Sequence, residues 1–263
     1  MTSADADGSV MISTRDGTVE TIRGDVVVGA DGVRSAVRAS LWPKARIRPI
    51  GMTAWRLVGR LADSGTVPGG DTWGRGDYAG LTPLADGRIY AWFATPVAAG
   101  APAEPGEALD WLRKRFGSWH PPLPQLLTDA TPDALLRNDL VDLAPLTSLV
   151  GGRVALVGDA AHAMTPNLGQ GACQALEDAV ELAAALDQQT AGGNDLAGQL
   201  RVYGSRRLAR VHRVARRSRT AGIAAALRGR VPTAIRNALV SAIPATMSLR
   251  ALDAVVDWTP PTA

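Results

Sequence analysis

The chain has 263 residues, of which 46% are hydrophobic, and carries a formal net charge of +3 with a pI near 9.5. A chain of this length and apolar content can bury a large core, in one large domain or in two smaller ones. Its single cysteine, Cys173, excludes an internal disulfide and a cysteine-only zinc site and fits a reducing cytoplasm. Residues 1–9 are small, acidic and polar, and no apolar run approaches the roughly 20 residues of a membrane span, so we expect a soluble cytoplasmic protein with no signal peptide and no membrane span.

The first residues predict a hairpin followed by a strand. Residues 10–14 and 18–22 flank Asp16-Gly17, and Asp-Gly between two alternating segments is the strongest short hairpin signal. Residues 25–29 (DVVVG) then predict a buried strand, and a short helix starts at about Ser35.

Asp31 follows that strand, where a parallel strand meets a helix. This position lies at the carboxyl end of the sheet, the side on which open α/β sheets bind ligands. Asp31 is therefore a candidate ligand contact, although a carboxylate here can equally cap the helix or shape the turn.

Residues 47–146 predict an antiparallel sheet with turns rich in Gly and Pro. The segments predicted as strands are 52–61, 72–73, 78–84 and 88–95. Alternation in the last of these places Tyr90 and Trp92 on one face and Ile89, Ala91 and Phe93 on the other, so both faces are expected to be covered.

Two segments complete this region. Residues 107–116 predict a helix with Leu109, Leu112 and Phe116 on one side. After a proline-rich turn at residues 121–124, the segment 135–143 is expected to cross back to the first domain.

One face of the sheet is a candidate wall for a substrate pocket. The residues that we expect to line it are Trp55, Arg56, Tyr78 and Trp92. For any one of these aromatic residues, a place in a core without a ligand is the more frequent alternative.

Residues 153–186 (RVALVGDAAHAMTPNLGQGACQALEDAVELAAAL) predict a strand, a glycine-rich loop and a helix. Residues 154–157 form the apolar run of a strand buried on both faces, which Gly158-Asp159 ends. Apolar positions of the helix recur at three- and four-residue spacing: Ala172, Ala175, Leu176, Ala179, Leu182, Ala183 and Leu186.

The start of that helix is suited to an anion. Gly169 and Gly171 let the backbone approach a ligand closely, and the free N–H groups of residues 171–174 lie at the positive end of the helix dipole.

A long basic helix is expected from Asn194 or Asp195 to about Ala221, after a break at Gly192-Gly193. Leu200, Val211, Val214 and Ala215 help to form its apolar stripe, and Arg206, Arg210, Arg213 and Arg217 share another face. We interpret the arginines as a solvated face rather than a phosphate or nucleic-acid site, because no aromatic side chains interleave with them. A further helix is expected near residues 233–242.

Two motifs resemble those of a known family. Residues 29–38 (GADGVRSAVR) resemble the DG motif of the single-component FAD-dependent aromatic hydroxylases, which are monooxygenases with the p-hydroxybenzoate hydroxylase fold. A second set of residues resembles the GD motif of the same family: Gly158-Asp159-Ala160-Ala161-His162 together with Pro166, Gly169, Gln170, Gly171 and Glu177-Asp178-Ala179. The resemblance covers nearly the whole chain.

This resemblance implies a fold and an activity. The fold is α/β with α+β character: an incomplete Rossmann-like FAD-binding domain, an antiparallel substrate-binding sheet and C-terminal helices. Its segments are residues 1–46 with the DG motif, 47–148 with the sheet, 149–190 with the GD motif, and the helical 191–263. The implied reaction is hydroxylation of a small aromatic molecule with NADH or NADPH and O2, through a C4a-hydroperoxyflavin.

The resemblance also implies roles for residues. Asp159 would bind a ribityl hydroxyl, the loop of residues 166–171 would lie against the isoalloxazine, and the helix from Gly171 would place its positive end at flavin N1 and O2. The complete set of implied cofactor contacts is Asp31, Gly32, Arg34, Gly158, Asp159, Pro166, Gly169, Gln170, Gly171 and Ala172. We interpret His162 as structural, since the sequence offers it no partner, and Cys173 as a packing position.

The chain departs from the family in one respect, because it contains no strand followed by GxGxxG. The nearest string, at residues 74–80, has the wrong spacing and no following helix. We therefore expect Met1 to start inside the FAD domain, with an open strand edge and weak or absent FAD binding.

Two functions follow as alternatives. The chain is either part of a flavoprotein hydroxylase whose first βαβ unit comes from another chain or an upstream start, or a non-catalytic binding domain of the same fold that holds no FAD. Neither alternative includes a nucleic acid or a metal ion, and the sequence assigns no catalytic residue.

Overall fold

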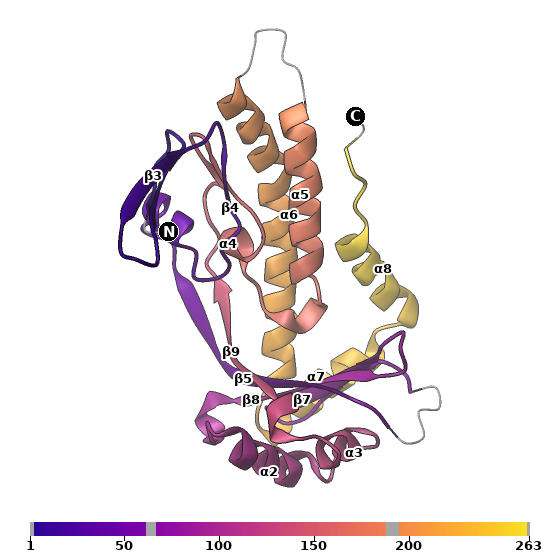
Figure 1. Ribbon diagram of the computed structural model, residues 1–263. Helices are drawn as coiled ribbons and strands as arrows, with labels where there is room; N and C mark the ends of the chain where they lie inside the picture. Colours follow the sequence, from indigo (N-terminus) through magenta and orange to yellow (C-terminus); the bar gives the residue numbers. More distant parts are fainter. Residues whose placement is uncertain (1–2, 62–66, 188–194, 262–263) are drawn as a thin grey trace. The chain divides into compact units, whose positions relative to one another are not determined.

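The computed structural model describes residues 3–61, 67–187 and 195–261 of the chain (Figure 1). These residues form two compact units. The first unit comprises residues 1–48, 141–222 and 244–263, and the second comprises residues 49–140 and 223–243.

The first unit contains two small sheets. One is the predicted hairpin, β2 (Ser9–Ser13) and β3 (Val19–Arg23), extended by β1 (Ser3–Ala4) in the order β1-β2-β3. The other has the order β10-β11-β4 and consists of β10 (Val150–Gly151), β11 (Val154–Leu156) and β4 (Val27–Gly29). Strands β11 and β4 are parallel, with Leu156 opposite Gly29.

The prediction of a buried strand over residues 25–29 is wrong in part. Strand β4 is shorter, and its central residue, Val28, is 46% exposed. Within the part of the chain that the structure describes, β4 pairs with β11 alone, so its other edge lacks a neighbour. Strand β11, which lies between two strands, is fully buried.

The first unit also contains helices, most of which contribute to its core together with this sheet. They are α1 (Ala36–Leu41), α4 (Asp159–His162), α5 (Gly171–Asp187), α6 (Leu196–Ala225) and α8 (Ala245–Val256). Helices α5 and α6 lie side by side (Figure 1), and Leu182, Leu200 and Tyr203 pack into the same core cluster as β11. The predicted cap is present on α6, where Asp195 accepts a hydrogen bond from the N–H of Gly198. The expected break at residues 192–193 lies outside the described residues.

Helix α5 turns a different face inward from the one that its apolar positions predict. Its buried residues are Gln174, Glu177, Asp178, Glu181, Leu182 and Ala185. Leu176 is 69% exposed, whereas Leu182 from the same predicted stripe is buried. The reason is a set of arginines on α6, which hold the carboxylates of α5 inside.

The second unit contains a five-stranded sheet in the order β6-β7-β8-β5-β9. Its strands are β5 (Ile47–Gly59), β6 (Gly70–Trp73), β7 (Tyr78–Pro83), β8 (Ile89–Pro96) and β9 (Leu136–Leu143). The strand pairs β5·β8, β6·β7 and β7·β8 are antiparallel, which confirms the predicted antiparallel sheet.

Helices α2 (Pro105–Phe116) and α3 (Leu123–Thr128) contribute to a core that includes one face of this sheet. Helix α2 was predicted, but α3 falls in what the sequence indicated as a proline-rich turn. Pro124 is tolerated because it stands in the first turn of α3, where its missing N–H has no helical partner to lose. On α7 (Arg230–Ala242), Arg236 donates hydrogen bonds to the carbonyls of Trp73 and Gly74.

Candidate functional site

The candidate site of the first unit begins where its two parallel strands end. Strand β4 leads into Asp31 and strand β11 into Asp159. Because Leu156 lies opposite Gly29 and the N–H of Val157 donates to the Gly29 carbonyl at 3.0 Å, both acids follow the same edge of the sheet. The parallel pairing thus brings the DG and GD motifs together, at the carboxyl ends of the strands.

Asp31 makes the contacts of a helix cap. Its Oδ2 accepts hydrogen bonds from the N–H groups of Ala36 at 2.7 Å and Val37 at 3.1 Å, at the start of α1. Burial opposes its ionisation, but bonds from Ser35 and these backbone groups outweigh burial and lower the pKa of Asp31. The capping alternative therefore describes its contacts, and its predicted role as a cofactor ligand stays a prediction, as do those of Gly32 and the exposed Arg34.

Asp159 has a different environment. It is exposed, and its carboxylate has no hydrogen bond or ion pair among the described residues. Gly158, which precedes it, has a positive φ of 56° and is buried, so the turn aims the chain sharply out of β11. Asp159 is thus an available acceptor at the end of a central strand.

The loop before α5 leaves room for a ligand. Pro166–Leu168 form a single 3₁₀ turn, closed by Gly169 with φ 64° in the left-handed region. No atom lies within 4 Å of the position that a Cβ would take at Gly169 or at Gly171. The neighbouring Gln170 is buried and Ala172 is exposed. The first N–H groups of α5 therefore stand beside open space.

A buried cluster of charges lies behind this loop. The carboxylate of Asp178 accepts hydrogen bonds from the N–H of Gly158 at 2.8 Å, from His162 Nε2 at 2.6 Å and from Arg207 Nε at 2.8 Å. The side chains of Asp178 and Arg207 are completely buried, and that of His162 is 2% exposed. Since Gly158 opens the GD motif, Asp178 fixes this turn from the facing helix.

Glu177 extends the cluster along the two helices. It binds Arg207, and its Oε1 accepts a hydrogen bond from Arg210 Nη2 at 2.7 Å. Burial raises the pKa of Glu177 and of Asp178, but Arg210 and Arg207 outweigh this effect at Glu177, and His162, Gly158 and Arg207 outweigh it at Asp178. Both carboxyl groups therefore have pKa values below their usual ones.

These contacts correct three predictions. The arginines of α6 are not simply a solvated face: Arg213 and Arg217 are exposed, but Arg210 is an ion-pair partner of Glu177. His162 has a partner in Asp178, which the sequence did not reveal. Cys173 is exposed and does not pack, because it lies on the outward side of α5.

Arg207 and Arg38 are structural residues that the sequence analysis missed. A signal for Arg207 was present, since acids of α5 at helical spacing face arginines of α6 at helical spacing. Arg38 is buried, and its guanidinium donates to the carbonyls of Ala160 at 2.8 Å and Val33 at 2.5 Å. It thereby ties the DG segment to the GD segment.

The predicted wall residues of the second unit do not share one face of the sheet. Tyr78 and Trp92 belong to the cluster of Met52 and Ala54, on one face. Trp55 is fully buried in the opposite cluster, with its ring centroid 5.7 Å from that of Trp111. Trp55 is therefore a core residue and does not line a wall with the other two, because neighbouring residues of a strand point to opposite faces.

Arg56 and Trp92 have polar partners on the sheet. Arg56 donates to the side-chain oxygen of Asn138 at 2.5 Å, and Trp92 Nε1 donates to Asp71 Oδ1 at 3.0 Å. Because Arg56 lies opposite Trp92 in the register of β5 and β8, the two side chains leave the same face of the sheet.

Known proteins are similar to this chain in sequence and in fold. Residues 145–218 match the family model described as FAD binding domain. The chain is 44% identical over 165 residues to aurachin C monooxygenase/isomerase of Stigmatella aurantiaca, covering 62% of this chain and 43% of that protein. It is 36% identical over 214 residues to the FAD-dependent urate hydroxylase of Klebsiella pneumoniae, covering 79% and 53%.

Solved structures agree with these relatives. The crystal structure of Klebsiella pneumoniae HpxO complexed with FAD and uric acid has a TM-score of 0.82 at 30% identity, covering 96% of this chain and 64% of that one. A salicylate hydroxylase substrate complex has a TM-score of 0.68 at 26% identity, covering 98% and 69%. The fold is that of a flavoprotein hydroxylase. The chain is similar over most of its length to FAD-dependent hydroxylases and monooxygenases, and it spans about half the length of the curated relatives that it matches.

Within the described residues, no helix combines the length and the apolar character that crossing a bilayer requires.

Proposed function

We propose that this chain forms the flavin-ring and substrate portions of an FAD-dependent monooxygenase, which hydroxylates a small aromatic molecule with NADH or NADPH and O2. The observation that carries the proposal is the open space at Gly169 and Gly171, beside the free N–H groups of α5, within the segment that matches an FAD binding domain. A flat, anionic ring can approach the free N–H groups of a helix start closely where glycines leave the space beside them open.

The roles of the residues follow from their contacts. FAD, when bound, supplies the redox chemistry by which oxygen is activated. Asp159 accepts a hydrogen bond from a ribityl hydroxyl, because its carboxylate is exposed and unpaired among the described residues. The N–H groups at the start of α5 stabilise negative charge on the ring, by about 0.3–1 kcal/mol when exposed and up to about 2 kcal/mol when partly buried.

The buried cluster serves to hold this geometry. Asp178 binds the N–H of Gly158, and His162, Gly158 and Arg207 together lower the pKa of Asp178, so the turn that presents Asp159 is fixed from α5 and α6. We assign these side chains to positioning, since they are buried and do not reach the open space at the loop.

On the second unit, we propose that the sheet face of Arg56 and Trp92 receives the aromatic substrate, with Tyr78, which is buried in the core cluster of the same face, supporting it. Aromatic side chains pack against an aromatic ring and exclude water from it, and a guanidinium compensates a negative charge on it. Photo-crosslinking with an aromatic carboxylic acid is expected to label this face. Labelling confined to other surfaces would remove the proposal for the substrate without affecting that for FAD.

The remainder of the FAD site lies outside these 263 residues in our proposal, on the same polypeptide or on another chain. The direct test is to incubate the purified chain with FAD, remove free FAD and record the flavin absorbance of the protein. We expect a yellow protein with about one flavin per chain when the remaining segment is supplied, and weaker uptake by the chain alone. A protein that stays colourless in both cases would show a binding domain that does not use flavin, which is the alternative function.

A further inference from the structure

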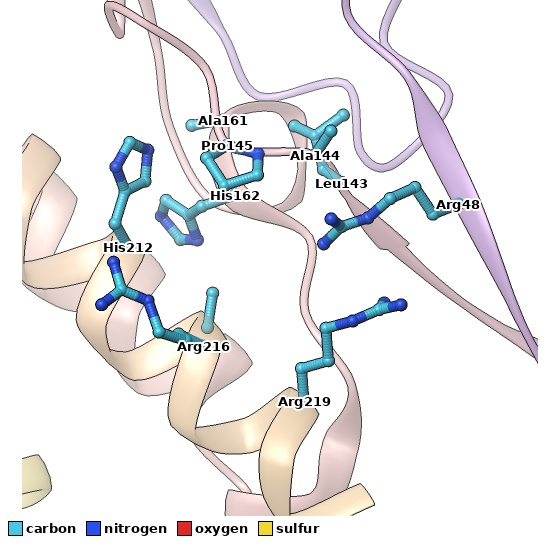
Figure 2. A pocket seen from close by; sticks show the side chains of 10 residues that line it. Arg48, Leu143, Ala144, Pro145, Ala161, His162, His212, Arg216 and Arg219 are labelled. Atoms are coloured by element: carbon cyan, nitrogen blue, oxygen red, sulfur yellow. The ribbon is translucent and has the colours of Figure 1, made fainter. Parts of the chain in front are cut away.

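A cavity of about 220 Å³ lies within the first unit, separate from the proposed flavin site. Figure 2 shows the side chains of Arg48, His162, His212, Arg216 and Arg219 around one space. The turn of residues 143–145 and two alanines supply apolar surface between these groups. None of the residues predicted to bind the cofactor lines this cavity.

The lining carries an excess of positive charge. Asp142 binds Arg48 through Nε at 2.7 Å and Arg219 through Nη1 at 2.5 Å, and its own side chain is 4% exposed. One carboxylate therefore serves two guanidinium groups. Arg216, the third, has no ion pair among the described residues. With one carboxylate for three guanidinium groups, two positive charges of the lining are uncompensated even when both histidines are neutral.

His162 adds an unpaired polar atom to the same lining. Its Nε2 donates to Asp178, which leaves Nδ1 buried with no hydrogen-bond partner among the described residues. A buried polar nitrogen without a partner is rare in folded proteins and indicates a place for a bound group. As imidazolium it would donate to an anionic oxygen, and as neutral imidazole it would accept from a protonated one.

The positively charged surroundings also affect the pKa of His212. Burial, Arg216 and His162 lower its pKa, and only the carbonyl of Leu146 opposes them. The charged groups around His212 on α4 and α6 are thus cationic, and an anion placed among them would relieve their repulsion.

We propose that this cavity binds the phosphate group of a small phosphorylated molecule. A phosphate dianion matches the two uncompensated charges, and its tetrahedral oxygens can reach donors on β5, α4 and α6 at once, whereas a planar carboxylate presents only two oxygens. The apolar surface of residues 143–145 and Ala215 then contacts the group that carries the phosphate. A free phosphate ion and a phosphate ester share this chemistry.

Calorimetric titration of the full chain at constant ionic strength tests the proposal, with inorganic phosphate, phenyl phosphate and benzoate as probes, and each titration is repeated on Arg216→Gln so that binding outside the cavity is subtracted. We expect both phosphates to bind and benzoate to bind at least about tenfold more weakly. Tighter binding of phenyl phosphate than of inorganic phosphate identifies an ester as the ligand. Absence of phosphate binding, or benzoate binding as tight as that of phenyl phosphate, would overturn the proposal.

Two variants of α6 separate a site from general attraction to a basic helix. Arg216→Gln removes a guanidinium of the lining that has no ion pair to lose, and Arg213→Gln removes an exposed one outside the lining. We expect phosphate affinity to fall about tenfold or more in Arg216→Gln and to stay within about twofold in Arg213→Gln. Equal losses in the two variants would show that no built site exists.

The imidazole of His162 gives a signal that is independent of affinity. Phosphate binding should shift the ¹⁵N resonance of His162 Nδ1 in the unmodified chain, because that atom gains a partner. A titration that leaves this resonance in place while phosphate binds would contradict the placement of the anion at His162.

Discussion

His162 Nε2 and Asp178 Oδ2 lie 2.6 Å apart, and both side chains are buried within the first unit. The pair connects the end of α4 to the middle of α5. Since Asp178 also binds the N–H of Gly158 and the guanidinium of Arg207, one carboxylate links the turn of the GD motif with two long helices.

Removing that carboxylate is expected to destabilise the chain strongly. Asp178→Ala removes one of the two buried carboxylates that compensate Arg207 and leaves the N–H of Gly158 and Nε2 of His162 without their acceptor. The loss of one member of a buried ion pair costs about 3–5 kcal/mol. Urea unfolding followed by circular dichroism measures the change. Asp187→Ala, at the exposed end of the same helix, is the control and should change the free energy of unfolding by less than about 0.5 kcal/mol. Equal stability of the two variants would contradict the role of Asp178.

The acid sensitivity of the fold follows from the same cluster. The pKa values of Glu177 and Asp178 in the folded chain lie below their ordinary values of 4.5 and 3.8. A group with a lowered pKa stabilises the fold fully above its ordinary pKa, and this contribution is lost as the pH falls through the lowered value. We expect the contribution of these two carboxylates to the urea midpoint to be constant above about pH 4.5 and to be lost below it. The lowered pKa of His212, in contrast, makes the midpoint decline as the pH falls below the ordinary value of 6.5 for that group.

The double variant Glu177→Gln/Asp178→Asn removes these two ionisable carboxyl groups and is the control for the loss of stability at acidic pH. It should be less stable at neutral pH and should lose less stability on acidification than the unmodified chain. If the urea midpoints of the two proteins depend on pH in the same way, the loss of stability at acidic pH comes from other ionisable groups.

Asp159→Ala tests the flavin proposal. Because the Asp159 carboxylate is exposed and has no partner among the described residues, we expect an unchanged free energy of unfolding and the loss of flavin uptake. Flavin absorbance after gel filtration measures the uptake, and Asp187→Ala should retain it. Full FAD content in Asp159→Ala would count against the assignment of the ribityl contact.

Gly169 and Gly171 should respond differently to substitution. Gly169 has φ 64°, so Gly169→Ala forces an L-residue into the left-handed region and should cost about 1–2 kcal/mol of stability. Gly171 is at the start of α5 with open space around it, so Gly171→Leu should keep the fold while its side chain fills the space beside the helix start. Flavin uptake should then fall in Gly171→Leu without a change in the urea midpoint. Normal uptake would show that no ring approaches this turn.

Helix α5 buries its acidic face and exposes part of the apolar stripe that the sequence predicted to lie inside, which gives a further prediction. Leu176→Glu should change stability by less than about 0.5 kcal/mol because Leu176 is 69% exposed. Leu182→Glu, which buries a new carboxylate at a position that is 7% exposed, should destabilise the chain by several times as much. Similar effects of the two substitutions would contradict this orientation of α5.

Local features of the fold could be predicted from the sequence. The Asp16-Gly17 hairpin, the apolar run of β11, the alternation in β8 and the glycines before α5 each depend on neighbours within a few residues, and the structure contains all four. The motif residues of the candidate site follow the ends of β4 and β11 for the same reason.

The sequence did not reveal which buried polar side chains pair with one another. Asp178 and Arg207 are 29 positions apart, and the helical spacing of acids on one helix and arginines on the other does not say which acid meets which arginine. Trp55 and Trp92 were expected on one wall, yet they lie on opposite faces, because pairing between β5 and β8 decides which face of each strand is shared.

The sequence by itself thus indicated the type and order of most elements and the motifs that stand at their ends, but not all of their bounds, since propensity, turn chemistry and periodicity act over one or two helical turns. Periodicity tells which residues of a helix share a face, but not which face lies inside. Only the tertiary structure decided that the acidic face of α5 is buried, because the arginines of α6 compensate those charges once the two helices lie together. The same packing created the cationic cavity at His162, which no segment of the chain contains alone.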